Sequence, residues 1–275
     1  MSLQNRVVVV TGSSRGIGRA IVAACASRGA RVVVSSRSKS AVDEAVDEIE
    51  AMGCSAAGLA ADVADPEEVQ ALFDFALSTY GALDVWVNNA GVTEGYRPLD
   101  ELTADELREI VSINLLGHMY GARVALRHFR AERRGYLMNM AGRGWKGEAT
   151  SHTAAYAATK TAIASLTRSL AAENKDVKGI SVNALVPGMV DTDFYKDIRI
   201  SQRLENSRDN WRYALDAFGV PLHEVGEKAA ELLGAEPGEK TGEIFSFISR
   251  GQVVTGGMKM AYWGMTGKLG REPGR

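Results

Sequence analysis

Short apolar runs alternate with longer segments of helical period along most of this 275-residue chain. Seven runs have the length of a strand, and they lie at about residues 6–11, 31–36, 55–61, 84–89, 136–140, 180–186 and 243–248. This alternation is typical of parallel strands joined by crossover helices. The first, fourth and sixth runs are apolar on both faces, as in strands that helices cover on each side. The pattern therefore predicts an α/β fold: a doubly wound domain with a seven-stranded, mostly parallel sheet and helices on both faces.

No repeat, low-complexity tract or linker rich in Pro, Gly or Ser divides the chain before residue 249. We therefore expect one domain over residues 1–248 and a Gly-rich, basic C-terminal extension over 249–275, whose end is a candidate for disorder. Two helix starts are marked in the sequence. "DPEE" at 65–68 combines an Asp N-cap with Pro at the first helical position, and "TADE" at 103–106 is a capping box.

Composition and charge argue against several classes of protein. The formal net charge is −2 and the pI is about 6.1, so the chain as a whole has no basic field for a nucleic acid. No apolar run approaches the roughly 20 residues of a membrane span, and the first residues lack the apolar core of a signal peptide, so we expect a cytoplasmic protein. Cys25 and Cys54 lie apart from other Cys and His residues, so we expect reduced thiols and no metal site.

The segment "VVVVTGSSRGIGRAIV" joins a buried strand to a helix through a glycine-rich turn. Gly12, Gly16 and Gly18 follow the spacing G-x-x-x-G-x-G, which differs from the G-x-G-x-x-G of the general dinucleotide fingerprint. The start of such a helix offers unpaired N–H groups and the positive end of the helix dipole to a phosphate. Taken alone, the turn is equally compatible with a purely structural role.

Further motifs follow this turn in a fixed order. They are "TGSSRGIG" at 11–18, "NNAG" at 88–91, Asn114 in "SINLLG", "YAATK" at 156–160 and "PGMVDT" at 187–192. Together they resemble the short-chain dehydrogenase/reductase family, over residues 6 to about 192 by motif and to about 248 by strand count. The resemblance implies a Rossmann-type sheet, a nicotinamide dinucleotide cofactor, hydride transfer between an alcohol and a carbonyl, and a homodimer or homotetramer.

Tyr156 and Lys160 are four residues apart on an expected helix and therefore share one face. An ammonium group beside a phenol favours the phenolate and lowers the phenol pKa from about 10, so the tyrosine can act as a general acid or base. The resemblance adds that Lys160 binds the nicotinamide ribose and that Asn114 holds a water molecule in a proton relay. Because Asn is disfavoured inside helices, a functional reason for Asn114 is expected.

The resemblance also implies a set of cofactor contacts. They comprise Gly12, Ser14, Arg15, Gly16, Ile17 and Gly18 in the first turn; Asp62 and Val63 at the adenine; Asn89, Ala90 and Gly91 near the ribose; Tyr156 and Lys160; and Pro187, Gly188, Val190 and Thr192 over the nicotinamide.

The choice of cofactor can be argued from charge at the end of the second strand. The segment "VVVSSRSKS" has no acidic residue that would accept hydrogen bonds from a free ribose 2′-OH. Arg37 in this segment and Arg15 in the glycine turn are both suited to pair with a 2′-phosphate. A solvated turn charge is the alternative for Arg37. We predict a preference for NADP(H) over NAD(H).

The resemblance fails at one catalytic position. The family places a serine at the end of the fifth strand, where its hydroxyl donates to the substrate oxygen. Counting back thirteen residues from Tyr156 reaches Arg143, whereas counting on from Asn139 reaches Ala141 and Gly142, and neither count yields a hydroxyl.

Three explanations for the missing serine are open. The Gly142/Arg143 turn supplies a substitute donor, the substrate polarises its own carbonyl, or catalysis is lost. We favour retained catalysis with the substitute donor, because Tyr156, Lys160 and Asn114 are all present together.

Residues 193–221 occupy the place of the family's substrate lid. Their aromatic residues, and two that flank the active-site loop, suit a medium-sized cyclic or aromatic carbonyl compound, unless they only pack on the sheet; they are Phe194, Tyr195, Trp211, Tyr213 and Phe218, with Trp145 and His152. The sequence thus predicts an NADP(H)-dependent oxidoreductase acting on a carbonyl or an alcohol. The alternatives are a non-catalytic dinucleotide-binding regulator or scaffold, and a related enoyl reduction or isomerisation.

Overall fold

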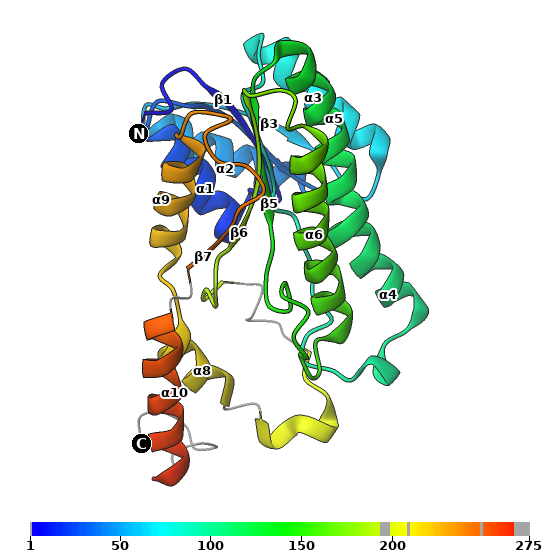
Figure 1. The fold of residues 1–275 in the computed structure, drawn as a ribbon, viewed down its shortest axis with the longest axis vertical. Coiled ribbons are helices and arrows are strands. Elements are labelled where there is room, and N and C mark those ends of the chain that lie inside the picture. Colours follow the sequence, from blue (N-terminus) through cyan, green and yellow to red (C-terminus); the bar gives the residue numbers. More distant parts are fainter. Residues whose placement is uncertain (1, 193–198, 208–209, 248–249, 267–275) are drawn as a thin grey trace.

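The structure, a computed structural model, describes residues 2–192, 199–207, 210–247 and 250–266 (Figure 1). It contains one sheet of seven strands: β1 (Val7–Thr11), β2 (Arg31–Ser36), β3 (Ser55–Ala60), β4 (Val85–Asn88), β5 (Gly135–Met140), β6 (Ile180–Val186) and β7 (Ile244–Ser246). The strand order is β3-β2-β1-β4-β5-β6-β7, and all pairings are parallel. Each strand agrees with a predicted run to within two residues at either end, so the predicted fold class is confirmed.

Helices cover both faces of the sheet. Figure 1 shows α1 (Gly16–Ala26), α2 (Lys39–Ala51) and α9 (Leu222–Leu233) on one side, and α3 (Pro66–Tyr80), α5 (Gly117–Glu132) and α6 (Ala154–Glu173) on the other. Successive residues of β1 alternate between two hydrophobic cores: Val8 and Val10 pack with α1 and α9, and Val9 packs with α3 and α5. Because side chains along a strand point to opposite faces, an apolar run on both faces is what a doubly covered strand requires.

The chain reverses its direction of winding between β1 and β4, which are neighbours in the sheet. After β1 the chain enters α1 on one face, and after β4 it leads to α4 (Ala104–Val111) on the side of α5 and α6. In open α/β sheets, ligands bind in the crevice that such a switch point opens at the carboxyl ends of the strands. The fold therefore places the ends of β1, β4, β5 and β6 around one crevice.

Both predicted helix starts are present. Asp65 accepts hydrogen bonds from the N–H groups of Glu67 and Glu68 at the start of α3, and Thr103 and Glu106 form the two reciprocal bonds of a capping box on α4. Helix α4 continues through a π-helical turn (Ser112–Leu116) directly into α5. Such a turn is often found at functional sites, and here it contains Asn114.

The region after β6 contributes short helices at the carboxyl edge of the sheet. They are a 3₁₀ turn (Gln202–Ser207), α8 (Asn210–Phe218) and α10 (Arg250–Met265). Helix α10 packs against α8, where the Tyr213 and Trp263 rings lie 5.1 Å apart. The sequence prediction missed α10, because glycines at 251, 256, 257 and 264 disfavour a helix on propensity and only the contact with α8 supports it. Residues 267–275, the predicted disordered end, lie outside the described residues.

Neither cysteine of the chain is paired. Cys25 is a buried residue of α1, where burial raises the pKa of its thiol to about 12, and Cys54 is half-buried in the turn before β3. Both are free thiols, as expected from the sequence. In the described parts of the chain there is no helix with the length and apolarity that crossing a membrane demands, and no cluster of metal-binding side chains.

Candidate active site

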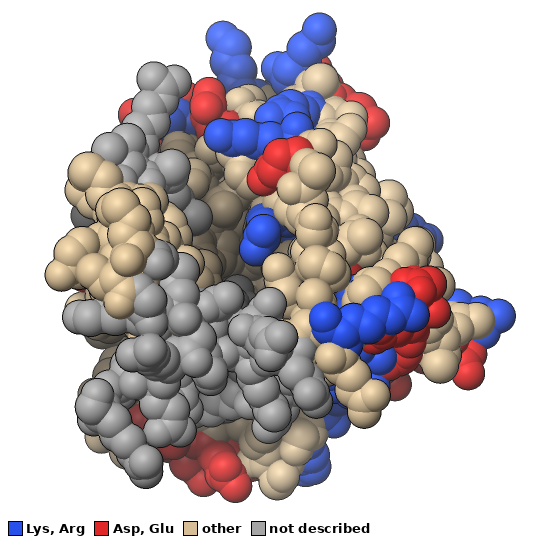
Figure 2. Space-filling model, turned by 90° about the horizontal axis from the view of Figure 1, so that it is seen from below, with Lys and Arg blue, Asp and Glu red and all other residues tan. Residues whose placement is uncertain are grey.

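A cavity of about 960 Å³ opens at the carboxyl edge of the sheet. Figure 2, which views the molecule from below this edge, shows the hollow in the surface. Its walls come from the ends of β1, β4, β5 and β6, from the start of α1, and from Phe218 of α8 and Met260 of α10. The glycine turn at one end and the Tyr156/Lys160 pair at the other therefore share one space.

Nearly all the residues predicted from the sequence line this cavity. Those present are Gly12, Ser14, Arg15, Gly16, Ile17, Gly18, Arg37, Asp62, Val63, Asn89, Ala90, Gly91, Gly142, Arg143, Tyr156, Lys160, Pro187, Gly188, Val190 and Thr192. Asn114 is the exception, because it is fully buried behind the cavity wall.

The turn between β1 and α1 is built for close approach. Gly12 and Gly16 have φ values of 64° and 56°, a conformation that favours glycine. A Cβ atom on Gly12 would lie 2.8 Å from the Cα of Ala90. The side-chain amide of Asn89 donates to the carbonyls of Thr11 and Gly12 at 2.8 and 3.0 Å, which ties the turn to the end of β4.

The start of α1 is open to an anion. Its N-cap residue, Arg15, makes no side-chain capping bond, and the first turn contains no acidic residue. The N–H groups at this end are therefore left for a ligand, and the helix dipole favours a negative one. The geometry of the turn fits the phosphates of a dinucleotide.

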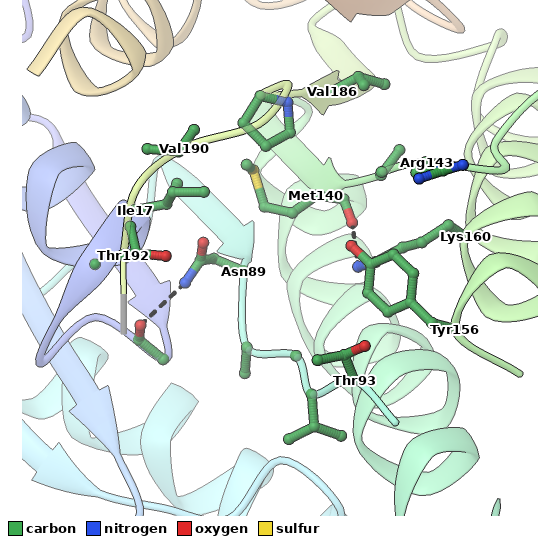
Figure 3. A pocket seen from close by; sticks show the side chains of 18 of the residues that line it. Ile17, Asn89, Thr93, Met140, Arg143, Tyr156, Lys160, Val186, Val190 and Thr192 are labelled. Atoms are coloured by element: carbon green, nitrogen blue, oxygen red, sulfur yellow. Dashed lines mark hydrogen bonds between the residues drawn. The ribbon is translucent and has the colours of Figure 1, made fainter. Parts of the chain in front are cut away.

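Tyr156 and Lys160 project from the first two turns of α6 into the cavity (Figure 3). The Lys160 Nζ lies 5.3 Å from the centre of the Tyr156 ring and donates a hydrogen bond to the Met140 carbonyl at 2.8 Å. The lysine side chain is buried, and this burial lowers its pKa to about 7. A small change in its surroundings therefore changes its charge near neutral pH, which makes it an adjustable partner for the phenol.

Asn114 fastens the loop after β4 to the π-helical turn. Its Oδ1 accepts from the Val92 N–H at 2.8 Å, and its Nδ2 donates to the Val92 carbonyl at 2.8 Å and to the Thr159 hydroxyl at 3.3 Å. A Cβ atom on Gly91 would lie 3.3 Å from the Asn114 Oδ1 and 3.8 Å from the Lys160 Nζ, so both groups flank Gly91. The structure thus gives Asn114 a structural role, and its role in a proton relay stays a prediction.

Gly142, one of the two positions that the counts gave for the missing serine, lies next to the hydroxyl of Tyr156. A Cβ atom on Gly142 would lie 2.5 Å from the Tyr156 Oη and 3.3 Å from the Lys160 Cγ. A heavy atom at 2.5 Å from the phenol oxygen is a clash, so any side chain here would displace Tyr156 or the strand end. The serine is therefore absent from a position whose Cβ atom would meet the phenol oxygen, and the phenol lies beside the backbone there.

The turn that follows Gly142 is held mainly by backbone groups. The Trp145 N–H donates to the Gly142 carbonyl at 3.1 Å, and Glu148 accepts from the N–H groups of Gly144 and Lys146 at 3.2 and 3.0 Å. Arg143 is exposed at the cavity wall, and no ion pair of its side chain is found in the described residues. Its guanidinium is therefore available to a ligand.

Apolar and aromatic side chains form a further part of the cavity wall. They are Tyr96, Trp145, Met189, Ile200, Phe218 and Met260. The Trp145 ring lies under the Lys146 ammonium at 5.1 Å. The His152 and Tyr96 rings lie 4.9 Å apart with an angle of 55° between their planes, and His152 does not line the cavity. Of the predicted lid aromatics, Phe194 and Tyr195 and the side chain of Trp211 lie outside the described residues.

Two buried ionisable residues next to this site were not predicted from the sequence. Glu94 is 3% exposed and contacts the start of α6. His118 is 1% exposed, and its Nε2 has no hydrogen-bond partner among the residues that the structure describes. Burial together with the charge of Lys160 holds the pKa of its ring well below the usual value. A lone Glu in a loop and a lone His in a helix carry no distinguishing pattern, although His118 is four residues after Asn114 on the same helical stretch.

Comparison with known proteins gives the same assignment along most of the chain. Residues 6–203 match the family described as short chain dehydrogenase. A hydroxynaphthalene reductase-like protein, Arp2, from Metarhizium guizhouense (strain ARSEF 977) is 34% identical over 271 residues, covering 93% of this chain and 96% of its own length. The probable chlorophyll(ide) b reductase NYC1 of Oryza sativa subsp. japonica is 36% identical over 206 residues, covering 68% of this chain but only 41% of that protein's length.

Among solved structures, a single-residue variant of actinorhodin polyketide ketoreductase with NADPH superposes with a TM-score of 0.78 at 29% sequence identity. The superposition covers 90% of this chain and 97% of the ketoreductase. With the family match spanning well over half of the residues, and with the glycine turn and the Tyr156/Lys160 pair in one cavity, this chain belongs to the short-chain dehydrogenase family.

Proposed function

We propose that this protein is an NADP(H)-dependent oxidoreductase that transfers a hydride between the nicotinamide and a carbonyl or alcohol of a medium-sized, cyclic or aromatic substrate. The observation that carries this proposal is the placement of Tyr156 and Lys160 in the same cavity as a glycine turn whose helix start is uncapped. A phosphate site alone would suit any nucleotide-binding protein, but a phenol beside a buried ammonium is suited to proton transfer.

The cofactor is bound by residues whose geometry fits a dinucleotide. All of these residues line the cavity: the α1 start and its glycines would hold the pyrophosphate, Asp62 and Val63 the adenine, and the segment 187–192 the nicotinamide. When bound, the nicotinamide supplies or accepts the hydride. The remaining chemistry falls to the residues of this chain.

Tyr156 is the proposed general acid and base. In the reductive direction its Oη donates a proton to the developing alkoxide, and in the oxidative direction it accepts one. Lys160 lies beside the ring and stabilises the phenolate that remains. Because Gly142 leaves the phenol against the strand end, the substrate oxygen has to approach Tyr156 from the cavity side, where Arg143 is also exposed.

Arg143 is the proposed substitute for the serine. No side chain fits at position 142 without a clash, and the Ala141 N–H already donates to the Leu185 carbonyl at 2.9 Å. Arg143 follows Gly142 directly and lines the cavity with an exposed side chain, and positive charge at a developing oxyanion lowers the barrier to reaction. Replacement by Ala should therefore lower kcat/KM more than replacement by Lys, and equal, negligible effects would exclude this role.

The preference for NADP(H) rests on Arg15 and Arg37 at the adenosine end of the cavity. The Arg37 Nη1 lies 3.8 Å from the Glu109 Oε1, and both side chains are more than half exposed. A loose surface pair of this kind contributes little, so a 2′-phosphate can compete with Glu109 for the guanidinium. The cytoplasmic location and the homodimer or homotetramer stay predictions of the sequence and of the family.

The cyclic or aromatic nature of the substrate rests on the aromatic residues of the cavity wall. Tyr96, Trp145 and Phe218 offer flat apolar surface to a ligand. Two relatives support the same direction, since their names refer to a hydroxynaphthalene and to chlorophyll(ide), both cyclic compounds.

A fluorescence titration with NADPH and NADH, followed by a panel of cyclic ketones and quinones, tests the proposal. We expect tighter binding of NADPH and loss of the reduced-nicotinamide signal with at least one panel member. Binding without oxidation over the whole panel would favour a dinucleotide-binding regulator, and a product reduced at a C=C bond would favour enoyl reduction. Tighter binding of NADH would overturn the cofactor assignment.

A further inference from the structure

Glu94 is a buried carboxylate that bonds to the backbone of the catalytic tyrosine. It lies in the loop between β4 and α4, is 3% exposed, and forms no ion pair with the described residues. Its Oε1 and Oε2 both accept from the N–H of Tyr156, at 3.1 and 3.2 Å, and the Thr93 hydroxyl lies 3.5 Å from Oε2. A buried carboxylate has to be compensated, and here the compensation comes mainly from the start of α6.

Helix α6 has no cap of its own. Its N-cap residue, Thr153, makes no capping bond with its side chain, and the first turn contains no acidic residue. Tyr156 is the third residue of the helix, at the position whose N–H a capping side chain normally accepts. Glu94, which is distant in the sequence, therefore caps the start of α6 in place of Thr153.

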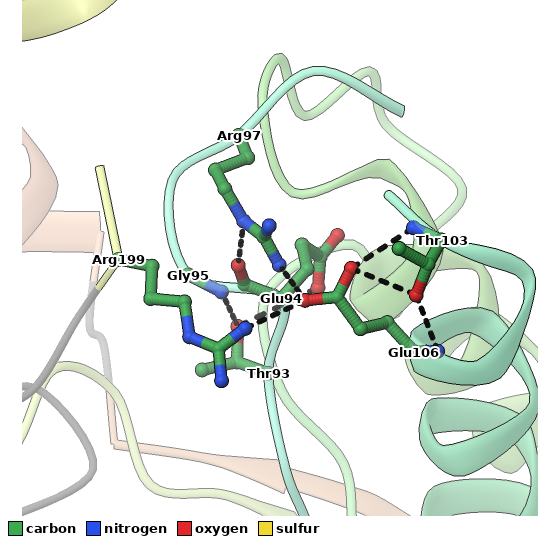
Figure 4. Close-up of polar contacts among 7 residues, drawn as sticks. All are labelled: Thr93, Glu94, Gly95, Arg97, Thr103, Glu106 and Arg199. Atoms are coloured by element: carbon green, nitrogen blue, oxygen red, sulfur yellow. Dashed lines mark hydrogen bonds and ion pairs between the residues drawn. The ribbon is translucent and has the colours of Figure 1, made fainter. Parts of the chain in front are cut away.

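The loop that carries Glu94 is itself tightly held (Figure 4). Arg97 donates from Nε to the Glu94 carbonyl at 2.9 Å and from Nη2 to the Glu106 Oε1 at 2.6 Å. The Arg97 N–H donates to the His152 carbonyl at 2.9 Å, which joins the loop to the residues just before α6. The pKa of Glu106 is lowered to about 2, first by the Thr103 N–H and then by Arg97, so this anchor is charged at all ordinary pH values.

The same loop also holds the chain beyond the undescribed residues 193–198. Arg199 donates from Nη1 to the Glu106 Oε1 at 2.7 Å, and Tyr96 pairs with Ile200 as an isolated parallel bridge. Tyr96 and Ile200 both line the cavity. The loop 94–97 thus contacts the catalytic helix through Glu94 and the substrate end of the cavity through Tyr96.

We propose that Glu94 is a positioning residue, whose carboxylate fixes the backbone of Tyr156 and so sets the place of the phenol beside Gly142. This inference rests on the proposed function, because it assigns a role relative to catalysis by Tyr156. The close approach at Gly142 shows how little tolerance the site has, since even one added carbon there would lie 2.5 Å from the phenol oxygen. A shift of about 1 Å in such a site is enough to cost about 100-fold in rate.

The charge of Glu94 gives the proposal a second readout. The Glu94 carboxylate contacts the backbone N–H of Tyr156, and a negative charge on that side of the residue disfavours the phenolate, so its removal should lower the pKa that limits turnover. The other ionisable groups around Tyr156 belong to its own helix, to α5 and to the strand–helix turn; they are Lys160, His118, Arg143, Lys146 and Glu148. All of these stay in place when Glu94 alone is changed.

The test compares Glu94→Ala and Glu94→Gln with the wild-type protein, using NADPH and a ketone that the wild type reduces. In Glu94→Ala we expect kcat to fall about 10- to 100-fold while the Kd for NADPH stays within about two-fold. In Glu94→Gln, which keeps an acceptor but loses the charge, we expect a smaller loss of kcat and a limiting pKa below that of the wild type. A kcat within about two-fold of wild type in Glu94→Ala would overturn the proposal.

Asp65→Ala is the matched control, because it also removes a carboxylate that caps a helix, here α3. We expect it to lower thermal stability to a similar extent and to leave kcat and its pH profile unchanged. An equal loss of kcat in both variants would show a general effect of stability and would overturn the proposal.

Amide hydrogen exchange separates this inference from the proposed function. We expect faster exchange at the start of α6 in Glu94→Ala but not in Asp65→Ala, whether or not a substrate is known. Unchanged exchange would overturn the contact on which the proposal rests. Full turnover by Tyr156→Phe would instead overturn the proposed function while the exchange result still reports on Glu94.

Discussion

Two glycine-rich turns line the same cavity, and their glycines make close approaches to different partners. The first, residues 11–18, joins β1 to α1, and the second, residues 141–147, follows β5. In the first turn the glycines bring the backbone close to Ala90 and leave the start of α1 open to a ligand. In the second turn Gly142 makes room for the phenol of Tyr156, a side chain of the protein itself. A glycine signals close approach, but only the fold shows what approaches.

The largest effect is expected from a methyl group in the first turn. In Gly18→Ala the added Cβ would lie 2.5 Å from the Asn89 Nδ2 and would also press on the Gly12 carbonyl. Because both are part of the tie between the turn and β4, the phosphate site is distorted, and we expect the Kd for NADPH to rise at least about 100-fold, or about 2.7 kcal/mol. Isothermal titration measures this, and the Tm of the apoprotein monitors folding. An unchanged Kd would show that the turn does not form the cofactor site.

The next prediction concerns Gly142 in the second turn, where a substitution should affect kcat and not NADPH affinity. Gly142→Ser restores the hydroxyl that the family places near this strand end, yet its Cβ would lie 2.5 Å from the Tyr156 Oη. We expect kcat to fall by about 10- to 100-fold, with NADPH affinity nearly unchanged, because the phenol is displaced and the cofactor turn is not. Ala141→Ser, at the neighbouring position where a Cβ already exists, should cost less. A rise in kcat in Gly142→Ser would show that the missing hydroxyl, and not the placement of the phenol, limits this site.

A third prediction concerns the buried Lys160 and the pH dependence of the free energy of unfolding. Burial lowers the pKa of Lys160 to about 7, whereas in the unfolded chain it is about 10.4. Between these values the unfolded state binds more protons, so the free energy of unfolding should rise with pH by up to about 1.4 kcal/mol per unit from this residue.

Lys160→Met should remove that slope between about pH 7 and 9. Above this window Cys25 opposes the trend, because the pKa of its thiol is raised to about 12 in the folded protein and stability falls as the unfolded thiol ionises. Denaturant unfolding at several pH values measures the difference between the two proteins. Parallel curves for wild type and Lys160→Met would contradict the burial of an adjustable lysine.

The smallest effect is expected at the adenosine end. In Arg37→Gln we expect NADPH to bind about 5- to 10-fold more weakly and NADH to be unaffected, because an exposed charge–phosphate contact contributes only modestly. Lys39→Gln is the control, since Lys39 is exposed nearby and pairs with Asp43 at 2.6 Å. Equal losses for both dinucleotides would show that Arg37 does not read the 2′-phosphate.

The sequence was sufficient for the sheet and for most of the cavity wall. Strands have a period of two, caps have fixed offsets, and the glycine turn and Tyr156/Lys160 lie on short local segments, so each could be predicted from neighbouring residues. Glu94 could not be predicted, because its partner is the Tyr156 backbone, 62 residues away. Likewise Gly142 and Arg143 were both candidates by counting, and only the packing of α6 against the end of β5 shows that position 142 meets the phenol.

Helix α10 and His118 show the same limit. Four glycines argue against a helix over residues 250–265, and the contact between Tyr213 and Trp263 that supports it joins two separate elements. His118 has no motif of its own, and its altered pKa comes from burial and from Lys160 on another helix. A local sequence pattern does not show which residues of other elements tertiary packing brings into contact with a segment.

Transfer of deuterium from NADPH labelled at C4 of the nicotinamide tests the central claim most directly. Both C4 stereoisomers are incubated with the enzyme and the ketone panel, and the products are analysed by mass spectrometry, with Tyr156→Phe as the matched variant. We predict that one stereoisomer delivers deuterium to the carbinol carbon of a product, and that Tyr156→Phe binds NADPH normally but loses about 100- to 10,000-fold of this transfer. Transfer that Tyr156→Phe retains in full, or NADPH bound tightly with no deuterium in any product, would contradict it.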